Sequence, residues 1–325
     1  MSIYRTLKGY NIKSVTSDPA NTKEGQIWYN DTSNKIRVNT IKPAAWASGG
    51  NLGTARFSMN QGAGTQTAGL VAGGNPSNST LAVAEEYNGS SWSEQNDLNT
   101  SRQMMGAAGT QTAAVFFGGR LIPPPSAKNE TEEYNGTSFS EQNNLGTARY
   151  AGGGAGTQTA GLFFSGGVGG STSVDTEEYN GTSWSEQNNM ATGRENIAGC
   201  GTQTAGLGFG GYANPGGASA LTEEYNGTSW TAGGNMGAAR YSLGGAGLQT
   251  AALAFGGSPG GVATTEQYDG SSWTSTASLA TARVQLAGLG TKTAGLATGG
   301  RNPSASNATE EFTDIVNAVT SLDVS

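Results

Sequence analysis

The chain of 325 residues contains no histidine and a single cysteine, Cys200, and only 13% of its residues are charged. Histidine is the commonest general base and metal ligand, and one cysteine can form neither an internal disulfide nor a cysteine-based zinc cluster. No Ser–His or Cys–His pair is therefore available for nucleophilic catalysis. We expect no enzyme activity, catalytic residue, cofactor or metal. A hydrolase built only from Asp and Glu stays open, although no carboxylate pair stands out.

Long apolar segments are also missing. No stretch approaches the roughly 20 apolar residues of a membrane span, so we expect no membrane insertion. The first residues, MSIYRTLKGYNIKS, lack the apolar centre of a secretory signal, so export is not expected either.

Charge is distributed unevenly along the chain. Residues 1–42 carry seven basic and three acidic residues, whereas the remainder carries ten basic and 21 acidic residues. A basic arm therefore precedes an acidic body. Because phosphate contacts need clustered Lys and Arg, we do not expect the body to bind nucleic acid.

Six copies of one short motif divide most of the chain. GTQTA begins at residues 64, 109, 156 and 201, with GLQTA at 247 and GTKTA at 290, so successive copies lie 43–47 residues apart. Repeats of this length suit a propeller blade of four short strands. Helical solenoids share the period but need apolar side chains at 3.6-residue spacing, which is absent here. The sequence predicts an all-β chain of six four-stranded units.

One unit can be divided into strands as an example. RYAGGGAG (149–156) predicts a first strand of small residues, TAGLFFSGG (159–167) an apolar second strand, TEEY (176–179) a third and TSWSEQ (182–187) a fourth. The intervening NG predicts a type I′ hairpin, whose two central residues have positive φ. The Tyr and Trp beside it are expected to pack as a cross-strand pair. The recurring phrase EEYNGTSW therefore favours a structural role over a sugar-binding site.

These units resemble the kelch repeat. A glycine doublet occurs in all six, beginning with Gly73–Gly74 and including Gly166–Gly167, and a following Tyr and Trp occur in four, as in Tyr87/Trp92, with Phe139 replacing a fifth Trp. The resemblance spans residues 42–315, although the Tyr-to-Trp interval of five residues is two shorter than usual. It implies a six-bladed kelch-like β-propeller at residues 41–317, followed by a C-terminal tail at 318–325.

The N-terminal strand of this propeller is expected to close its last blade. In five units an aromatic residue stands ten positions before an arginine, and Trp46 stands ten positions before Arg56 although no EEY precedes it. The last unit has EEF (310–312) but no later Trp. Residues 44–48 are therefore expected to pair beside residues 308–313, which leaves no open edge.

Charged residues recur in phase with the repeat. A ring of charges that binds an ion in the central channel is one interpretation. We favour the other, in which each Arg pairs with one Glu on a neighbouring strand or blade. The residues are Arg56, Arg102, Arg149, Arg194, Arg240 and Arg283 with Glu85, Glu132, Glu177, Glu223, Glu266 and Glu310.

The segments after the glycine doublets differ in every unit and are expected on one face of the ring. A constant frame with divergent loops is typical of a binding module, and neutral drift of the loops is the alternative. The longest loop is RLIPPPSAKNET (120–131). The candidate contact residues are Leu121, Ile122, Pro123, Pro124, Tyr212 and Asn214.

Residues 1–40 contain a separate feature. EGQIWYNDTSNKIRV (24–38) predicts a hairpin and resembles the G-x-I-W-Y-N hairpins near the start of many bacteriophage virion proteins, notably tail and fibre proteins of marine phages. The resemblance implies an arm that attaches the protein to other virion proteins, in one or more copies per particle. Trp28, Tyr29, Lys35 and Arg37 are the candidate attachment residues. An arm this short is expected to order only against its partner.

Three functions are compatible with these features. The first is a phage structural protein of tail or fibre type, made in the host cytoplasm and located on the virion at tail or capsid, whose loop face recognises a host glycan or receptor. The second is an architectural decoration or adaptor protein that contacts neighbouring virion subunits. The third is a cellular kelch-type adaptor or lectin, which the arm makes less favourable. Glycan binding in solution would favour the first, and burial of the loop face in a particle the second.

Overall fold

The computed structural model describes residues 4–7 and 10–322, and these residues form strands and loops with no helix. No helix in this part of the chain is thus long and apolar enough to cross a membrane. The predicted all-β class is confirmed. The chain divides into two compact units. We call Trp46–Phe312 the six-sheet unit, and Met1–Ala45 together with Thr313–Ser325 the terminal unit.

The described part of the six-sheet unit contains six antiparallel sheets of four strands each. In five of these sheets the four long strands of one repeat pair in chain order, and in the sixth β5 takes the fourth place. The sheets are β6 (Ala63–Thr65), β7 (Ala68–Ala72), β8 (Ala84–Tyr87), β9 (Trp92–Glu94); β10 (Gly106–Thr110), β11 (Ala113–Phe117), β14 (Thr131–Tyr134), β15 (Phe139–Gln142); β16 (Gly153–Thr157), β17 (Ala160–Phe164), β20 (Thr176–Tyr179), β21 (Trp184–Gln187); β22 (Ala198–Thr202), β23 (Ala205–Phe209), β26 (Thr222–Tyr225), β27 (Trp230–Ala232); β28 (Gly244–Leu248), β29 (Ala251–Phe255), β30 (Thr265–Tyr268), β31 (Trp273–Thr276); and β32 (Ala287–Gly290), β33 (Gly295–Thr298), β34 (Thr309–Thr313), β5 (Ala45–Ser48).

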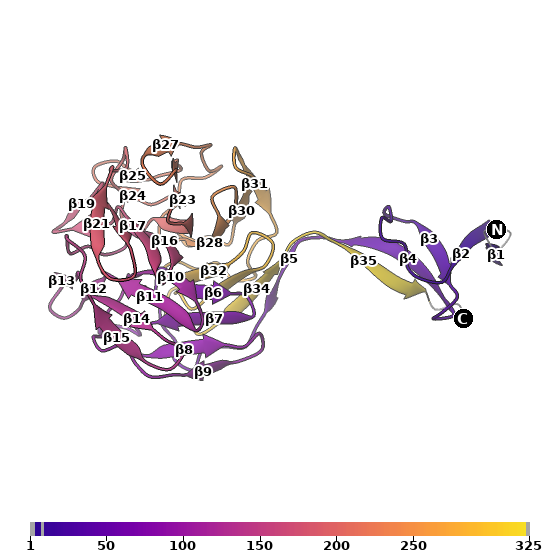
Figure 1. Cartoon of the computed structure of the whole chain (residues 1–325), viewed down its shortest axis with the longest axis horizontal. Helices are drawn as coiled ribbons and strands as arrows, with labels where there is room; N and C mark the ends of the chain where they lie inside the picture. The colour runs from indigo at the N-terminus through magenta and orange to yellow at the C-terminus, as the bar shows by residue number, and fades with distance from the viewer. Residues whose placement is uncertain (1–3, 8–9, 323–325) are drawn as a thin grey trace. The chain divides into compact units, whose positions relative to one another are not determined.

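The first strands of the six sheets lie beside one another in chain order, from β6 through β10, β16, β22 and β28 to β32, and β32 lies beside β6. Figure 1 shows the sheets set around these strands, with the fourth strands at the periphery. The first strands approach so closely that side chains would collide. A Cβ atom on Gly199 would lie 2.7 Å from the carbonyl oxygen of Gly154, which itself belongs to the neighbouring first strand. This crowding explains why the first strands consist of small residues.

The last sheet contains strands from both ends of the six-sheet unit. β5 pairs beside β34, as the position of Trp46 predicts. The Trp46 indole N–H donates to the Thr265 hydroxyl at 3.0 Å, and its ring centroid lies 5.0 Å from that of Phe255 and 5.2 Å from that of Phe312. Trp46 thus takes the place that the fourth-strand tryptophan has in other sheets.

The turn between the third and fourth strands differs from the predicted type I′ hairpin. Tyr179 pairs with Trp184, which confirms the cross-strand pair but leaves four residues in the loop. Gly181 has a φ of 87°, whereas Asn180 has no positive φ. The Asn180 side-chain oxygen instead accepts the backbone N–H groups of residues 182 and 183 at 2.9 Å each. The prediction of a two-residue turn was wrong because the Asn side chain completes a longer turn.

The glycine doublet marks a pair of left-handed residues. In the second repeat these are Gly118 (φ 63°) and Gly119 (φ 97°). In the third repeat Ser165 (φ 60°) and Gly166 (φ 105°) occupy the same places, one residue before the doublet matched in the sequence. Gly167 therefore stands at the variable position that follows the pair.

Short two-stranded ladders extend three of the variable loops. They are β12 (Arg120–Leu121) with β13 (Ser126–Ala127), β18 (Gly167–Val168) with β19 (Ser171–Thr172), and β24 (Tyr212–Ala213) with β25 (Gly217–Ala218).

The terminal unit is a five-stranded sheet in the order β1 (Tyr4–Leu7), β2 (Tyr10–Val15), β3 (Ile27–Asn30), β4 (Lys35–Lys42), β35 (Val316–Leu322). The predicted hairpin is present as β3 and β4, whose register includes Trp28 opposite Arg37. β35 pairs with β4 along its whole length, from Val316 opposite Lys42 to Leu322 opposite Ile36.

These pairings correct the boundaries expected from the sequence. Residues 318–322 form a strand rather than a tail, and residues 41, 42, 316 and 317 belong to this sheet rather than to the region at 41–317 predicted to form the propeller. Residues 323–325 of the expected tail lie outside the described residues. The arm is ordered against the end of its own chain, so the expectation that it orders only against a partner was wrong. The added strand supplies the pairing partner that the arm lacks in isolation.

Candidate ligand-binding site

Each repeat arginine meets the glutamate with which the sequence analysis paired it. The six Nη2–Oε1 distances are 2.7–2.9 Å, and both side chains are buried in every pair. In the third sheet, Arg149 Nη1 also donates to the carbonyls of Ser165 (3.0 Å) and Asp175 (2.7 Å), the two ends of the variable loop. The second oxygen of Glu177 accepts the N–H of Gly146 at 2.7 Å, in the connection from the preceding sheet. The pair thus closes the base of a loop and joins two sheets.

The same bonds recur in all six repeats, and they leave these charges without a free binding surface. Burial lowers the pKa of each arginine, and the charge of the partner glutamate opposes this shift. A buried, hydrogen-bonded ion pair of this kind positions the backbone and is not accessible to a ligand.

The phrase EEYNGTSW joins each sheet to the one before it. The Tyr179 hydroxyl donates to Glu133 at 3.0 Å, and the Trp184 indole N–H donates to the Thr131 hydroxyl at 2.9 Å. The amide of Gln158, from the GTQTA motif, donates to the carbonyls of Ala114 and Tyr134. The Glu, Tyr and Trp side chains of the third copy of the phrase are therefore engaged in structural bonds.

The first and last sheets are joined in the same way. The Tyr87 hydroxyl donates to Glu311 at 2.5 Å, and the Trp92 indole N–H donates to Thr309 at 2.9 Å. The Gln66 amide donates to the carbonyl of Phe312 at 2.6 Å. The sequence of sheet-to-sheet bonds thus returns to its beginning.

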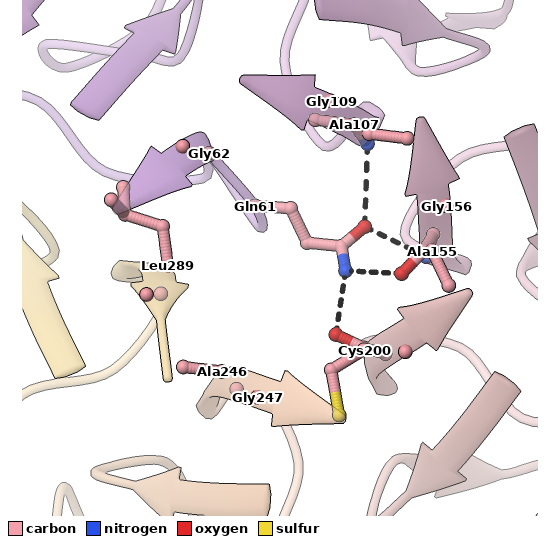
Figure 2. Close-up of a pocket in the computed structure, with 18 residues that line it drawn as sticks. Gln61, Gly62, Ala107, Gly109, Ala155, Gly156, Cys200, Ala246, Gly247 and Leu289 are labelled. Carbon is pink, nitrogen blue, oxygen red and sulfur yellow. Dashed lines mark hydrogen bonds between the residues drawn. The ribbon is translucent and has the colours of Figure 1, made fainter. Parts of the chain in front are cut away.

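The cavity at the centre of the first strands is blocked by one side chain. It has a volume of about 130 Å³, and Gln61 projects into it (Figure 2). The Gln61 amide nitrogen donates to the carbonyls of Gly154 and Gly199 at 2.9 Å each, and its oxygen accepts the N–H of Gly154 at 2.7 Å. None of the described residues that line this cavity is charged. The interpretation of a charged ring around the channel is therefore wrong.

Cys200 also lines this central cavity. Its thiol is buried, and burial raises its pKa to about 12. The thiol therefore stays protonated near neutral pH, which agrees with the expected role of a small core residue rather than a nucleophile.

The predicted contact loops lie at one end of the first strands and touch one another. Leu121 and Ile122 are half-buried, whereas Pro123 and Pro124 are exposed. The carbonyl of Ile122 accepts the N–H of Thr80 in the neighbouring loop at 3.4 Å. The predicted contact residues of this loop therefore lie beside the loop of the first repeat, and we call the variable loops at this end the rim.

The loop of the fourth repeat joins the same rim. Asn214 is exposed, and its amide donates to the carbonyl of Gly170 in the preceding loop at 3.2 Å. Tyr212 is 36% exposed, and its ring packs edge-on against Tyr241 with centroids 5.4 Å apart.

Inside this rim lies a ring of paired positions that the sequence analysis missed. The residue after each repeat arginine forms an isolated β-bridge with the residue after the left-handed pair. We call these twelve residues the mouth ring. They are Phe57 and Asn75, Gln103 and Arg120, Tyr150 and Gly167, Glu195 and Tyr212, Tyr241 and Ser258, and Val284 and Arg301. No two of the six pairs are alike.

The mouth ring borders a hollow of about 280 Å³. Arg120, Tyr150, Glu195, Tyr241 and Arg301 line it, together with smaller side chains. The hollow is asymmetric because the third repeat has glycine at a mouth-ring position. A Cβ on Gly167 would lie 2.6 Å from the Glu195 carboxylate and 2.6 Å from the Tyr150 ring.

Charge within the hollow is partly compensated. The Arg120 guanidinium lies 5.0 Å from the Tyr150 ring centroid. Burial raises the pKa of Glu195, and the charge of Arg120 and a hydrogen bond from Tyr150 oppose that shift. Burial also raises the pKa of Tyr150, and the Glu195 charge adds to the effect. Arg120, Tyr150 and Glu195 therefore form one interacting group at one side of the hollow.

The candidate attachment residues have different environments in the terminal unit. Trp28 is only 1% exposed, and its indole N–H donates to Asp18 at 2.8 Å. Arg37 is half-buried and donates to the Ser321 hydroxyl of β35 at 2.9 Å, whereas Lys35 is exposed. The Tyr29 hydroxyl donates to Asn34 at 3.1 Å.

Trp28 is therefore a core residue rather than an exposed anchor. Asp18, in the loop between β2 and β3, accepts hydrogen bonds from both the Trp28 indole and the Asn30 amide. Hydrogen bonds from Asn30 and Trp28 lower the pKa of Asp18, so its carboxylate stays ionised while it accepts these bonds.

The mouth ring carries a signal in the sequence that could have revealed it. The six arginines are followed by F, Q, Y, E, Y and V, although the residues just before each arginine repeat closely. A variable position inside a constant frame is a sign of specificity, but only the β-bridges show that these positions converge.

No group of three or more Cys, Asp or Glu residues that could hold a metal occurs in the described part of the chain. Comparison of the chain with protein-family models and with curated proteins finds no match. The resemblances to kelch repeats and to phage hairpins therefore rest on the quoted residues alone.

Proposed function

We propose that the six-sheet unit is a six-bladed kelch-like β-propeller that binds ligands without catalysis. The sheet-to-sheet bonds that run from the first repeat to the last and back to the first support this architecture. In a propeller the sheets are blades, and the first strands surround the axis.

The binding face is the end of the propeller that carries the mouth ring and the variable loops. One observation carries this assignment. The repeated Arg, Glu and Tyr side chains form structural bonds, whereas seven of the twelve mouth-ring residues, which differ between repeats, line one hollow. Mixed polar and aromatic walls around a concavity are typical of a binding site.

The protein then serves as a virion protein of tail or fibre type that recognises a glycan or receptor on the host surface. The hairpin at residues 24–38 supports the phage origin, since it resembles those of virion proteins. The terminal unit exposes Ile315, Val319 and Leu322, which suits docking to another virion protein better than buried Trp28 does.

Site-directed labelling tests the binding face. Ser126, at the start of β13 in the second variable loop, and Ser140, on fourth strand β15, are both exposed. Each is replaced by cysteine in the full chain and coupled to a maleimide-linked polyethylene glycol. Buried Cys200 does not react because its thiol is protonated and inaccessible. Binding to an array of immobilised bacterial lipopolysaccharides and capsular polysaccharides is then measured.

We expect the Ser126 conjugate to lose binding and the Ser140 conjugate to keep it. The reverse result would place recognition on the outer strands. If the unlabelled chain binds no polysaccharide and a particle reconstruction shows the loop face buried against another subunit, the architectural role replaces the recognition role.

A further inference from the structure

The hollow inside the mouth ring contains one cation that is not compensated. Its charged lining residues are Arg120, Glu195 and Arg301, a net charge of +1 with Glu195 ionised. Arg120 interacts with Tyr150 and Glu195, whereas the ion pairs among the described residues do not include Arg301. An anionic group therefore has a partner in Arg301.

Arg301 is also oriented for such a partner. Its guanidinium lies over the ring of Phe57, 4.8 Å from the centroid, and the side chain is exposed. Stacking on an aromatic face restricts the guanidinium while its N–H edge remains free to donate. A planar carboxylate can accept two parallel hydrogen bonds from that edge.

The remaining walls match a ligand with hydroxyl groups and an apolar ring face. Tyr241 presents a half-buried ring that Tyr212 supports from the side. The buried Oε1 atom of Gln285, in the same lining, has no hydrogen-bond partner among the described residues. Such an atom can accept a hydroxyl hydrogen, and the Ser258 hydroxyl can donate or accept.

The size of the hollow limits the ligand to one unit. Its volume of about 280 Å³ is near the lower end of small-molecule sites, which begin at roughly 300 Å³. A free phosphate would contact Arg301 but leave the tyrosine wall and Gln285 without a role. An acidic peptide would bring a carboxylate but few hydroxyl groups.

We propose that this hollow binds one carboxylated monosaccharide, a uronic or nonulosonic acid unit of a surface polysaccharide, with its carboxylate at Arg301 and its ring against Tyr241. The proposal rests on the recognition role of the loop face and specifies the ligand class. Gln285 and Ser258 receive the hydroxyl groups.

Matched sugars test the charge requirement. Full-length protein is titrated by ligand-observed NMR with glucuronic, galacturonic and mannuronic acids and N-acetylneuraminic acid, and with glucose, galactose, mannose and N-acetylmannosamine as neutral counterparts. At least one acidic sugar is expected to bind about tenfold or more tightly than its neutral counterpart, because a hydrogen bond to a charged group is worth about that ratio.

Two variants locate the interaction. Arg301→Gln should remove the preference for the acidic sugar, and Tyr241→Ala should weaken the acidic and neutral sugars together. Lys292→Gln is the matched control because it removes one positive charge at the β32–β33 turn, at the other end of the same sheet. It should leave the affinity unchanged, and circular dichroism checks that each variant is folded.

Several results would overturn the proposal. Equal binding of acidic and neutral sugars, an effect of Lys292→Gln as large as that of Arg301→Gln, or absence of binding by every sugar each excludes a carboxylate site at Arg301. Inorganic phosphate or a short polyglutamate peptide that binds more tightly than all the sugars would assign the hollow to another anion. The Ser126 label distinguishes failure of the proposed binding face from failure of the proposed ligand class. If that label still blocks polysaccharide binding while Arg301→Gln has no effect, the face is correct and the ligand class is wrong.

Discussion

The two units of this protein differ in the number of large apolar side chains that they expose. Nine large apolar side chains are exposed in the described residues, and six of them lie in the much shorter terminal unit. They are Ile27, Ile41, Ile315, Val316, Val319 and Leu322. In the six-sheet unit, by contrast, buried Arg–Glu pairs and Tyr–Glu and Trp–Thr bonds recur from sheet to sheet.

The difference suits a six-sheet unit that is held together by its own bonds, and it supports the proposed docking of the terminal unit to another virion protein. The repeated polar bonds join neighbouring sheets of the same chain. A five-stranded sheet with exposed aliphatic residues is typical of a surface that becomes buried on assembly. The following predictions, from the largest effect to the smallest, test this contrast.

Alkaline pH should have the largest effect because it acts on the whole six-sheet unit at once. Burial, reinforced by the bond to glutamate, raises the pKa values of Tyr87, Tyr134 and Tyr268 to about 12 and also raises those of Tyr179 and Tyr225. Because the folded pKa values exceed the ordinary value of 10.0, this stabilisation is complete below pH 10 and is lost as the pH rises through 12.

Denaturant midpoints measured between neutral pH and pH 12, together with tyrosinate absorbance, check this expectation. Tyr134→Phe should lessen the dependence, since one raised group is removed. If all five tyrosines ionised near pH 10 without loss of structure, the sheet-to-sheet bonds would not hold the unit together.

Removal of one repeat arginine should have the next largest effect. Arg149→Ala leaves buried Glu177 without its partner, which typically costs about 3–5 kcal/mol in the free energy of unfolding. Lys128→Ala is the control, since its pair with Glu130 is partly exposed and contributes less than about 1 kcal/mol. Urea denaturation measures both. A folded Arg149→Ala protein that had lost ligand binding would contradict the purely structural role of the pair.

Substitution of one tryptophan in each unit tests whether the two units fold independently. Trp46→Ala removes the bond to Thr265 and the contacts with Phe255 and Phe312, and should destabilise the six-sheet unit by about 3 kcal/mol. Trp28→Ala should act on the terminal unit only. Hydrogen exchange followed by mass spectrometry reports on each unit separately. Faster exchange throughout β6–β34 in the Trp28→Ala protein would show that the two units do not fold independently.

Substitution of exposed aliphatic residues in the terminal unit should alter assembly but hardly alter the free energy of unfolding. Ile315→Ser combined with Val319→Ser is expected to change the free energy of unfolding by no more than about 0.5 kcal/mol per site, because both side chains are exposed. Incorporation into particles should fall, as measured by immunoblotting of purified virions. Leu248→Ser, an exposed apolar site in the six-sheet unit, should have no effect on incorporation. Equal losses for both proteins would remove the distinction between the units.

Much of the fold follows from local sequence. The period of the GTQTA motif predicts six four-stranded sheets, and the aromatic residue ten positions before Arg56 predicts the place of β5. The matched counts of Arg and Glu predict the ion pairs. These features are predictable because each repeat forms the same short-range strand pairing and the same bonds to its neighbour. The same sequence signal for one local structure therefore occurs six times.

Other features depend on residues far apart in the sequence. The register of β35 on β4 joins segments at opposite ends of the chain, and no local pattern near Val316 or Lys42 specifies that partner. The burial of Trp28 depends in the same way on the loop that contains Asp18. A candidate anchor became a core residue because exposure is decided by the neighbours that tertiary folding provides.

The sequence by itself determined the repeat, the strand content and the Arg–Glu pairs, because all of these recur in each of the six units. Tertiary structure alone decided that Arg120, Tyr150, Glu195, Tyr241 and Arg301 border one hollow. These residues come from five different repeats, and no local pattern within a single repeat shows that they meet. They meet because the first strands surround a common centre, which brings together positions that are about 45 residues apart in the chain.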